Sequence, residues 1–477
     1  MQNPSIKFGT DGWRAVIGDT FTFANLEVVA RATAQWLHRR YGEAPKVILG
    51  HDTRFMGRQF AEHAARVLAD EGVHVLFADG FAPTPAVSWA AAAYGCSAGI
   101  VITASHNPPE YNGFKIKADF GGPATPEMIE EVEAEMAQLR HPSGSLPAFR
   151  ALVGDGRVEL RNLTDDYLGM LRERLDLDAI RAAGLRVAHD AMYGAAQGLV
   201  SRLIGHEHVV ELRSNWNPGF KGRAPEPIER NLHGLAEAVV REGCDAGLAN
   251  DGDADRIGMY DEHGAFVDSH RLLSLLVKYL YQERGLRGDV VKTFSSTHMI
   301  DRMGEAYGLN VITTPIGFKY IASHIVEGDV LVGGEESGGM AVKGHLPERD
   351  GLYIGLLVVE MMVKRGMTLS ALVRELSDEF GPHVARRIDV HTTEAKKQAV
   401  LARLKGGGGL DRIAGRAVRR HESLDGFKHL LDDGWLLVRP SGTEPVLRVY
   451  SESTSAEAAD ALIDDALVQL GVRDDVP

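Results

Sequence analysis

The chain has 477 residues, of which 44% are hydrophobic and 25% are charged, a composition typical of a globular protein with several domains. Its formal net charge of −14 argues against non-specific nucleic-acid binding, which needs a basic surface. The N-terminal residues lack the apolar core of a signal peptide, and no apolar stretch approaches the length of a membrane span. We therefore expect a cytoplasmic protein that binds neither nucleic acid nor a membrane.

Strand-like and helix-like runs alternate as far as about residue 375, which predicts α/β units with parallel or mixed sheets. Three such units can be recognised, and each runs from one predicted strand to another: 46–52 to 99–103, 185–190 to 245–251, and 289–294 to 330–334. Each unit ends in a polar loop after its second strand. Ligands bind beyond the carboxyl ends of strands in open α/β sheets, so the three loops could face one cleft.

Other segments indicate boundaries between these units. Residues 141–147 are typical of a linker, and residues 261–264 predict a hairpin turn near a second boundary. After residue 382 the pattern changes, which predicts a smaller α+β domain from about residue 385. The four glycines at 406–409 predict a flexible surface loop within that domain.

The first polar loop places Ser105 directly after the apolar run 98–104. Serine, asparagine and proline are common in turns, and the hydrolase pattern Gly-x-Ser-x-Gly is absent because Thr103 and Asn107 flank the serine. His106 is adjacent in sequence, but adjacency alone does not orient a general base. A plain turn and a nucleophile both remain open for this segment.

The second loop, Asn250-Asp-Gly-Asp-Ala-Asp-Arg256, carries three alternating carboxylates: Asp251, Asp253 and Asp255. They would not share a helix face, but they can converge in a loop. Converged carboxylates repel each other unless a cation neutralises them, and hard oxygen ligands favour Mg²⁺, Ca²⁺ or Mn²⁺. An EF-hand is excluded because Arg256 stands where its sixth position needs glycine. A solvated acidic turn is the alternative to a metal site.

Two more loops follow predicted strands. The segment 332–339, Val-Gly-Gly-Glu-Glu-Ser-Gly-Gly, offers paired glutamates that could bind sugar hydroxyls or lie in an exposed turn. The segment 436–445, Leu-Leu-Val-Arg-Pro-Ser-Gly-Thr-Glu-Pro, combines Arg439 with hydroxyls and glycine-freed N–H groups, which suits a phosphate better than a surface hairpin. The segment 8–14 is a weak signal alone. Lys115 follows Ser105 closely enough to reach the same cleft.

Together the four loops resemble the signature loops of the α-D-phosphohexomutase family, and they occur in the family order along the whole chain. The resemblance implies an α/β fold with four domains around a central cleft, namely three related α/β domains with mixed sheets and a C-terminal α+β domain. The expected domains and their loops are 1–150 with the phosphoserine loop, 151–262 with the metal loop, 263–380 with the sugar loop and 381–477 with the phosphate loop.

The resemblance also implies a role for each matching residue. Ser105 is expected to be the phosphoserine. One Mg²⁺ is expected to be held by a phosphoserine oxygen together with Asp251, Asp253 and Asp255. The implied catalytic residues are Arg14, Ser105, His106 and Lys115. The implied substrate-binding residues are Arg256, Lys319, Glu335, Ser337, Arg439, Ser441, Gly442 and Thr443.

The chain departs from the family pattern at Gly339, because some members carry a histidine directly after the sugar loop. The residue that transfers protons is therefore left open among His106, Lys115, His345 and Arg349. Of these, His106 and Lys115 are favoured because they neighbour Ser105.

The implied reaction interconverts glucose 1-phosphate and glucose 6-phosphate. Phosphoserine gives its phosphoryl group to the free hydroxyl of the hexose phosphate, and the resulting glucose 1,6-bisphosphate, also the expected activator, turns around and returns its other phosphate. The expected partners are therefore small hexose phosphates. Mannose and glucosamine phosphates are alternative substrates. A metal-dependent sugar phosphatase and a non-catalytic sugar-phosphate binder are rival functions, and the sequence leaves the oligomeric state open.

Overall fold

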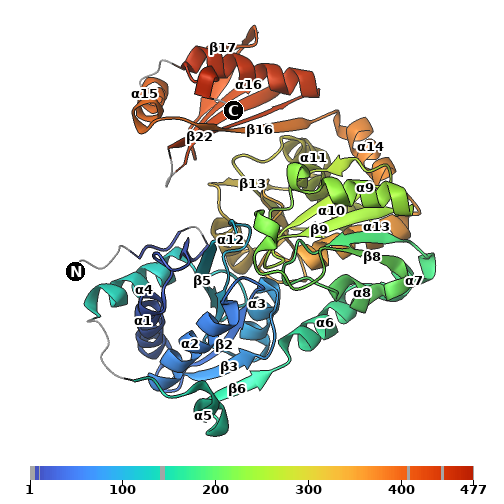
Figure 1. Cartoon of the computed structure of the whole chain (residues 1–477). Helices are drawn as coiled ribbons and strands as arrows, with labels where there is room; N and C mark the ends of the chain where they lie inside the picture. The colour runs from blue at the N-terminus through green and yellow to red at the C-terminus, as the bar shows by residue number, and fades with distance from the viewer. Residues whose placement is uncertain (1–5, 10, 140–144, 406–408, 442–444, 476–477) are drawn as a thin grey trace.

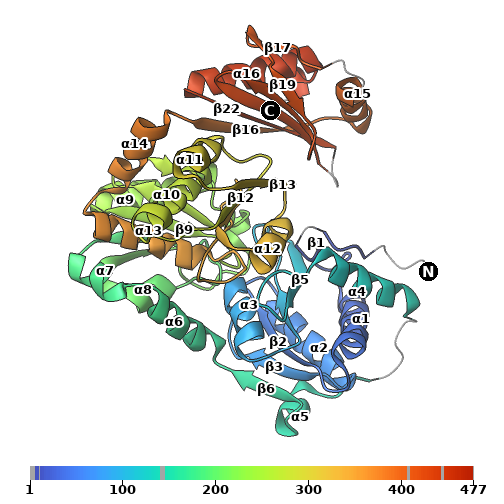
Figure 2. The same ribbon diagram turned by 180° about the vertical axis from the view of Figure 1, so that it is seen from behind.

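The computed structural model of the chain describes residues 6–9, 11–139, 145–405, 409–441 and 445–475. Most of the predicted linker 141–147 and of the predicted glycine loop 406–409 lies outside these residues. In Figures 1 and 2 the N-terminal part (blue) and the central part (green to orange) lie side by side, and the C-terminal part (red) forms a separate mass above them. No helix of the described part combines the length and apolar character needed to cross a membrane.

The first sheet has the strand order β1-β5-β4-β2-β3-β6. Its strands are β1 (Trp13–Val16), β2 (Lys46–His51), β3 (His74–Ala78), β4 (Ala98–Ile102), β5 (Tyr111–Ala118) and β6 (Val158–Arg161). The helices of this part are α1 (Phe23–Tyr41), α2 (Gly57–Asp70), α3 (Thr84–Ala93), α4 (Pro126–Gln138) and α5 (Phe149–Gly154). Strand β2 is parallel to β3 and β4, whereas β5 is antiparallel to β4. The parallel pairing of β6 with β3 extends this sheet beyond residue 150.

The second sheet has the order β11-β10-β9-β7-β8. Its strands are β7 (Val187–Asp190), β8 (Val209–Leu212), β9 (Ala246–Asn250), β10 (Ile257–Asp261) and β11 (Phe266–Val267). The helices are α6 (Leu163–Arg174), α7 (Leu177–Ala183), α8 (Leu199–Ile204), α9 (His233–Glu242) and the short 3₁₀ turns η1 (His206–His208), η2 (Phe220–Gly222) and η3 (Glu229–Asn231). Strands β10 and β11 pair antiparallel, which confirms the hairpin turn predicted at 261–264.

The third sheet has the order β13-β12-β14-β15. Its strands are β12 (Asp289–Thr293), β13 (Val311–Thr314), β14 (Val330–Gly334) and β15 (Met340–Val342). The helices are α10 (Ser269–Gln282), α11 (Met299–Tyr307), α12 (Phe318–Glu327), α13 (Gly351–Arg365) and α14 (Leu369–Phe380). Helix α13 also packs against β9 and β10, so the second and third sheets share one hydrophobic core, which reaches into the first as well.

The C-terminal sheet has the order β16-β22-β21-β20-β19 and is antiparallel throughout. Its elements are β16 (Val384–His391), β19 (Arg420–Glu422), β20 (Phe427–Leu431), β21 (Gly434–Pro440), β22 (Val446–Ser453), the ribbon β17 (Arg412–Ile413) and β18 (Arg416–Ala417), α15 (Glu394–Lys405), α16 (Ala456–Leu470) and η4 (Arg473–Asp475). This α+β domain has its own core and meets the third sheet where Phe294 packs against Trp435 and Tyr450.

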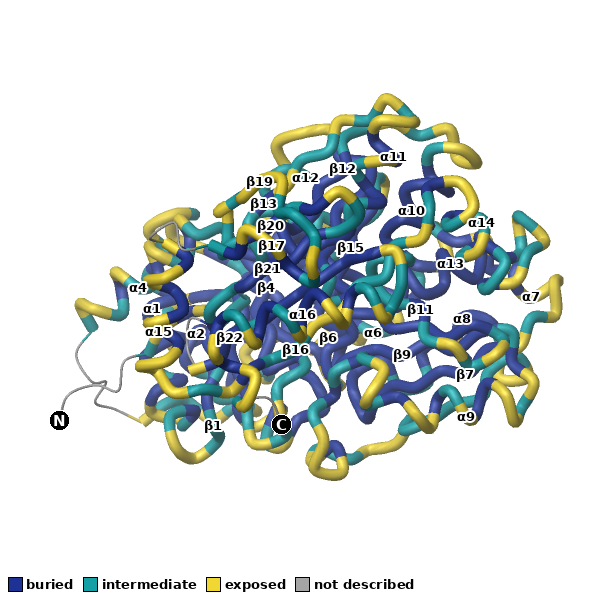
Figure 3. Tube along the Cα trace, turned by 90° about the horizontal axis from the view of Figure 1, so that it is seen from above, coloured by how far each residue is buried: buried dark blue, intermediate teal, exposed yellow. Residues whose placement is uncertain are grey.

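One local arrangement recurs in the first three sheets. A buried strand (β4, β9 or β14) runs parallel to a neighbour, and the next strand (β5, β10 or β15) returns antiparallel beside it. Figure 3 shows β4 and β9 among the buried segments in the interior of the trace. The polar loops predicted from the sequence are the connections within these pairs, so the strands on both sides fix each loop. The α/β fold with a threefold repeat is confirmed.

Candidate active site

Ser105 lies in a tight turn just after β4. Its φ of 52° is in the left-handed region, which is unfavourable for a serine and is often retained at functional sites. The backbone N–H donates to Thr103 Oγ1 at 2.9 Å, and the side-chain hydroxyl donates to Asp251 Oδ2 at 2.7 Å. The loop of the first sheet thus aims this hydroxyl at the acidic loop of the second.

The buried guanidinium of Arg54 holds the Ser105 turn from behind. It donates hydrogen bonds of 2.6 to 3.0 Å to the backbone carbonyls of Ser105, Asn107, Pro108 and Tyr111. Its Nε lies 3.2 Å from Asp52 Oδ2, and burial raises the pKa of Asp52 to about 6. The sequence analysis missed Arg54, although an aspartate at the end of the predicted strand 46–52 and an arginine two residues later were a signal.

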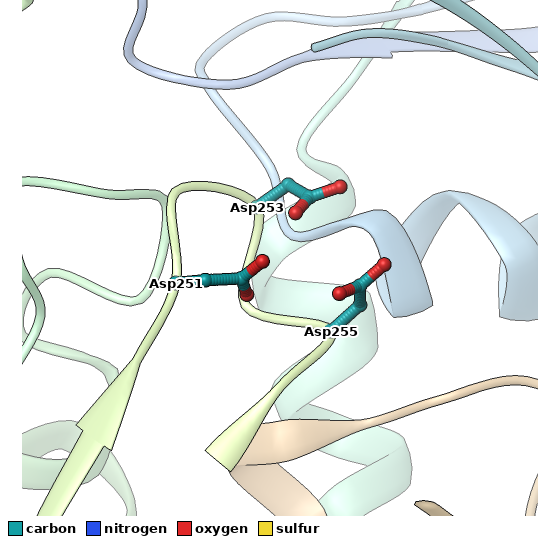
Figure 4. A group of neighbouring side chains, drawn as sticks. All are labelled: Asp251, Asp253 and Asp255. Atoms are coloured by element: carbon teal, nitrogen blue, oxygen red, sulfur yellow. The ribbon is translucent and has the colours of Figure 1, made fainter. Parts of the chain in front are cut away.

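The three aspartates of the second loop converge, as Figure 4 shows. One ligand atom from each lies within 4.8 Å of the others, and all three side chains are fully buried. Burial, followed by the neighbouring carboxylates, raises the pKa of Asp251 well above its ordinary value. Among the described residues, Asp253 Oδ1 and Asp255 Oδ1 have no hydrogen-bond partner. A buried set of carboxylates with free oxygens fits a hard divalent cation and does not fit a solvated turn.

Lys115, on β5, connects this metal loop to the first domain. Its buried ammonium lies 2.8 Å from Asp253 Oδ2, 3.2 Å from Asp255 Oδ2 and 2.8 Å from Asp11 Oδ2. Burial disfavours the charged amine, but the coulombic attraction of Asp11, Asp253 and Asp255 outweighs it and raises the pKa of Lys115. Lys115 is therefore a fixed cation at neutral pH.

His106 and Arg14 flank Ser105. His106 Nδ1 lies 3.3 Å from Ser105 Oγ, and burial together with the nearby Arg256 and Arg14 lowers the pKa of His106 well below its ordinary value. A neutral imidazole beside a hydroxyl can accept a proton. Arg14 donates to Asn107 Oδ1 at 2.8 Å, and Arg256 Nε lies 3.9 Å from Asp255 Oδ1.

The sugar loop begins with the buried Glu335, directly after β14. Burial raises its pKa to about 7, although Arg349, whose NH1 lies 3.8 Å from Glu335 Oε2, opposes this shift. Ser337 Oγ is buried without a hydrogen-bond partner among the described residues, so its hydroxyl is available to a ligand. Lys319, on α12, has its Nζ 5.2 Å from the ring centroid of Tyr320.

The phosphate loop follows β21. Arg439 Nε donates to Asp425 Oδ1 at 2.9 Å, and the other oxygen of Asp425 accepts the backbone N–H of Ile316 at 2.9 Å. The Ser441 N–H donates to the carbonyl of Val446. The predicted residues Gly442 and Thr443 lie outside the described part of the chain.

Arg448 is a further candidate that the sequence analysis missed. It lies directly opposite Arg439 in the β21–β22 pair and opposite Asp389 in the β16–β22 pair, and its buried Nε has no hydrogen-bond partner in the described ranges. Like charges at opposite positions of a sheet repel each other, so this pair suits an anion. No strand was predicted for residues 446–453, so the sequence analysis held no signal for this arginine.

The structure thus brings Ser105, His106 and Lys115 together with the aspartates, and adds Arg349 to the same network. No hydrogen bond or ion pair among the described residues joins Lys319, Ser337, Arg439 or Ser441 to it directly. His345 lies apart: Arg174 donates to its Nδ1, its Nε2 binds Asp350 at 2.8 Å, and its ring stacks on Tyr353. These contacts assign His345 a packing role.

Comparison with known proteins matches the four domains of one family. The matching models describe phosphoglucomutase/phosphomannomutase α/β/α domain I at residues 5–142, domain II at 165–264 and domain III at 268–380, and the C-terminal domain at 388–468.

Individual relatives cover nearly the whole chain. A Thermococcus kodakarensis protein named phosphoglucomutase/phosphomannomutase is 32% identical over 95% of both chains. A Pyrococcus abyssi protein named probable phosphoglucosamine mutase is 31% identical over 96% of both. The crystal structure of a putative phosphomannomutase from Thermus thermophilus is 34% identical, with a TM-score of 0.86 over 98% of this chain and 100% of that one. This chain therefore belongs to the phosphoglucomutase/phosphomannomutase family of α-D-phosphohexomutases, which are isomerases.

Proposed function

We propose that this phosphohexomutase interconverts the 1- and 6-phosphates of mannose and of glucose through a phosphorylated Ser105. The observation that carries the proposal is the 2.7 Å hydrogen bond from the buried Ser105 hydroxyl to Asp251, inside a ring of cations and carboxylates. The sequence favours glucose, with mannose as an alternative substrate, and the names of the relatives favour including that alternative, because they contain phosphomannomutase.

The chemistry follows from the groups around Ser105. The bond between phosphorus and Ser105 Oγ breaks, and a bond forms from phosphorus to the free hydroxyl oxygen of the hexose phosphate. Catalysis of such a transfer is mainly positioning and charge stabilisation. Arg14, Lys115 and Arg256 supply positive charge. The three aspartates and a phosphoserine oxygen would hold one Mg²⁺, which supplies further neutralisation of the phosphoryl oxygens when bound.

The attacking hydroxyl must also lose its proton. Lys115 and Arg349 are poor acceptors because neighbouring carboxylates keep both protonated by raising their pKa values. His345 is held by Arg174 and Asp350. His106 is neutral because its pKa is lowered, and it lies 3.3 Å from Ser105 Oγ, so we assign it the exchange of a proton with the serine oxygen: it takes the proton when Ser105 is phosphorylated again and returns it when the phosphoryl group leaves.

Substrate binding would divide between the other two loops. Glu335 and Ser337 would bind the sugar hydroxyls. Arg439 and Ser441, with Gly442 and Thr443, would bind the phosphate that is not transferred, and Arg448 would add a second guanidinium. Lys319 is proposed as an additional contact to the sugar phosphate.

Phosphorus NMR of the purified protein with Mg²⁺, a trace of glucose 1,6-bisphosphate and each hexose 1-phosphate tests the proposal. We expect growth of the mannose and glucose 6-phosphate signals, and no growth with Ser105→Ala, because the phosphoryl carrier is lost. Release of inorganic phosphate instead would indicate a phosphatase. Turnover by Ser105→Ala would refute the phosphoserine.

Glucosamine phosphate is the second candidate substrate. Several relatives at 30 to 31% identity are named probable phosphoglucosamine mutases, and two of them cover 98% of this chain. The same spectra recorded with glucosamine 6-phosphate rank this candidate. If kcat/KM for glucosamine phosphate exceeds that for both neutral hexoses, the mannose and glucose proposal is wrong.

A further inference from the structure

Arg349 joins the three α/β domains at one point. It lies directly before α13, and its side chain is only 4% exposed. Its NH2 binds Asp11 of the first domain and lies 2.8 Å from Asp255 Oδ2 of the metal loop. Its NH1 lies 3.8 Å from Glu335 Oε2 of the sugar loop. One guanidinium therefore contacts a carboxylate from each domain.

The backbone beside Arg349 is tied to the same metal loop. The N–H of Gly351 donates to the carbonyl of Ala254 at 3.1 Å. A Cβ added to Gly351 would lie only 2.1 Å from the carbonyl oxygen of Arg256, so the two segments touch through their backbones. The contact at Gly351, two residues after Arg349, holds the backbone next to the metal loop. The ion pair with Asp255 holds the guanidinium against the same loop, so both ends of the Arg349 side chain are fixed.

The side chain of Arg349 packs directly against the backbone of Gly339. Its φ is outside the left-handed region, so backbone conformation does not require glycine there. A Cβ at this position would lie 2.3 Å from Arg349 Cδ and 2.9 Å from Arg349 Cγ. The stem of Arg349 therefore fills the space that any other side chain at position 339 would need.

We infer that Arg349 is a positioning residue that orients Asp255 toward the metal ion and fixes the sugar loop to the metal loop. Position 339 must be glycine because the side chain of Arg349 passes over it. Arg349 and Lys115 take Asp255 Oδ2, while Asp255 Oδ1 has no hydrogen-bond partner among the described residues and only the more distant Arg256 Nε, at 3.9 Å, beside it. Holding one oxygen decides which oxygen faces the ion. This inference rests on the metal role that the proposed function gives the aspartates.

Mn²⁺ binding to the full-length protein tests the inference without turnover. The electron paramagnetic resonance signal of free Mn²⁺ measures how much of the ion is bound. We expect Arg349→Ala to raise the Mn²⁺ Kd by about 10- to 100-fold, the usual effect of losing a partner that orients a metal ligand. Electrostatics alone predicts a lower Mn²⁺ Kd for Arg349→Ala, because removal of a positive charge near a cation site strengthens cation binding. Arg349→Lys keeps the positive charge but loses the planar guanidinium that contacts several carboxylates at once. We therefore expect weaker Mn²⁺ binding in this variant too.

The packing of Arg349 against Gly339 allows a second test by the same Mn²⁺ measurement. Gly339→Ala leaves Arg349 in the sequence but displaces its stem, so it should also raise the Mn²⁺ Kd. Once Arg349 is absent the added methyl group has room, and the double variant should match Arg349→Ala within about twofold. Gly169→Ala, in α6, is the matched control, because nothing lies within 4 Å of its added Cβ.

Thermal melts confirm that each variant is folded, and Asp253→Asn confirms that the Mn²⁺ signal belongs to this site. An unchanged or lower Kd in folded Arg349→Ala overturns the inference, and so do single effects that multiply in the double variant. Loss of Mn²⁺ affinity as expected in a protein that turns over no hexose phosphate would refute the proposed function and leave this inference standing.

Discussion

At the scale of single residues, the site consists of ionisable groups whose ordinary behaviour is shifted by burial. Ser105, Lys115 and the three aspartates are almost completely excluded from solvent. Charges in such a place persist only if each has a partner, and the salt bridges of Lys115 supply three of them. Within the described part of this site, the oxygens Asp253 Oδ1 and Asp255 Oδ1 have no hydrogen-bond partner and are therefore free for a ligand.

Glu335 allows a direct test of this balance. Its ordinary pKa of 4.5 is raised to about 7, so the folded protein binds its proton more tightly than the unfolded chain does. The contribution of the protonated Glu335 to the free energy of unfolding is complete below pH 4.5 and is lost as the pH rises through 7. We expect the wild type to lose about 2 kcal/mol relative to Glu335→Gln between pH 5 and pH 8.

Urea denaturation of both proteins in metal-free buffer at the two pH values measures the difference. Glu327→Gln is the matched control, because it removes an exposed carboxylate at the end of α12, in the same domain. A stability difference between wild type and Glu335→Gln that stays constant with pH would contradict the raised pKa.

At the scale of elements, the paired strands explain what the sequence predicts well. The expected strands 46–52, 99–103 and 330–334 match β2, β4 and β14, because continuous apolar runs bounded by polar loops are a strong local signal. The loops that follow them were located for the same reason.

Long-range packing explains what the sequence did not predict. Arg54 lies 51 residues before the serine whose turn it holds, and Arg349 lies 338 residues after Asp11. The addition of β6 to the first sheet likewise depends on a distant partner strand, because Val158 pairs with Val75, 83 residues earlier in the chain. Such contacts leave no periodic pattern in one sequence.

The contact between two loops gives a prediction at this scale. A Cβ added to Gly252 would lie 2.5 Å from the carbonyl oxygen of Ser105, so the metal loop touches the serine turn through its backbone. We expect Gly252→Ala to lower kcat by at least tenfold, because a displaced nucleophile loses its geometry. Steady-state kinetics and thermal melts measure the effect, with Gly169→Ala as control. Normal kcat in Gly252→Ala would show that this contact is not needed.

At the scale of the whole molecule, three domains form one body and the fourth is attached to it differently. The large hydrophobic core includes side chains from the first three sheets, whereas the C-terminal domain has a core of its own. Its contacts with the third domain include a small aromatic cluster and the buried Lys428, whose Nζ donates to the Phe294 carbonyl at 2.9 Å. This interface is the natural place for relative motion.

Lys428 makes this interface sensitive to pH. Burial, and then the charge of Lys292, lowers its pKa from 10.5 to about 7. The unfolded chain therefore holds the proton more tightly than the folded protein does, and stability rises with pH between 7 and 10.5. From pH 7 to pH 9 we expect a gain of about 2 kcal/mol in wild type relative to Lys428→Met.

Differential scanning calorimetry at both pH values measures this gain, with Lys405→Met, on α15 of the same domain, as the control. A wild-type stability that follows the same pH course as that of Lys428→Met would show that Lys428 does not titrate in this range.

The burial of Ser105 has a consequence for how the enzyme is first activated. A protein kinase must draw its target serine into its own catalytic groove on an exposed, extended segment. Ser105 is 1% exposed, sits in a left-handed turn, and has its backbone held by Arg54. On the proposed function, we therefore expect its first phosphate to come from a small molecule that can enter between the domains, such as a sugar bisphosphate, and not from a protein kinase.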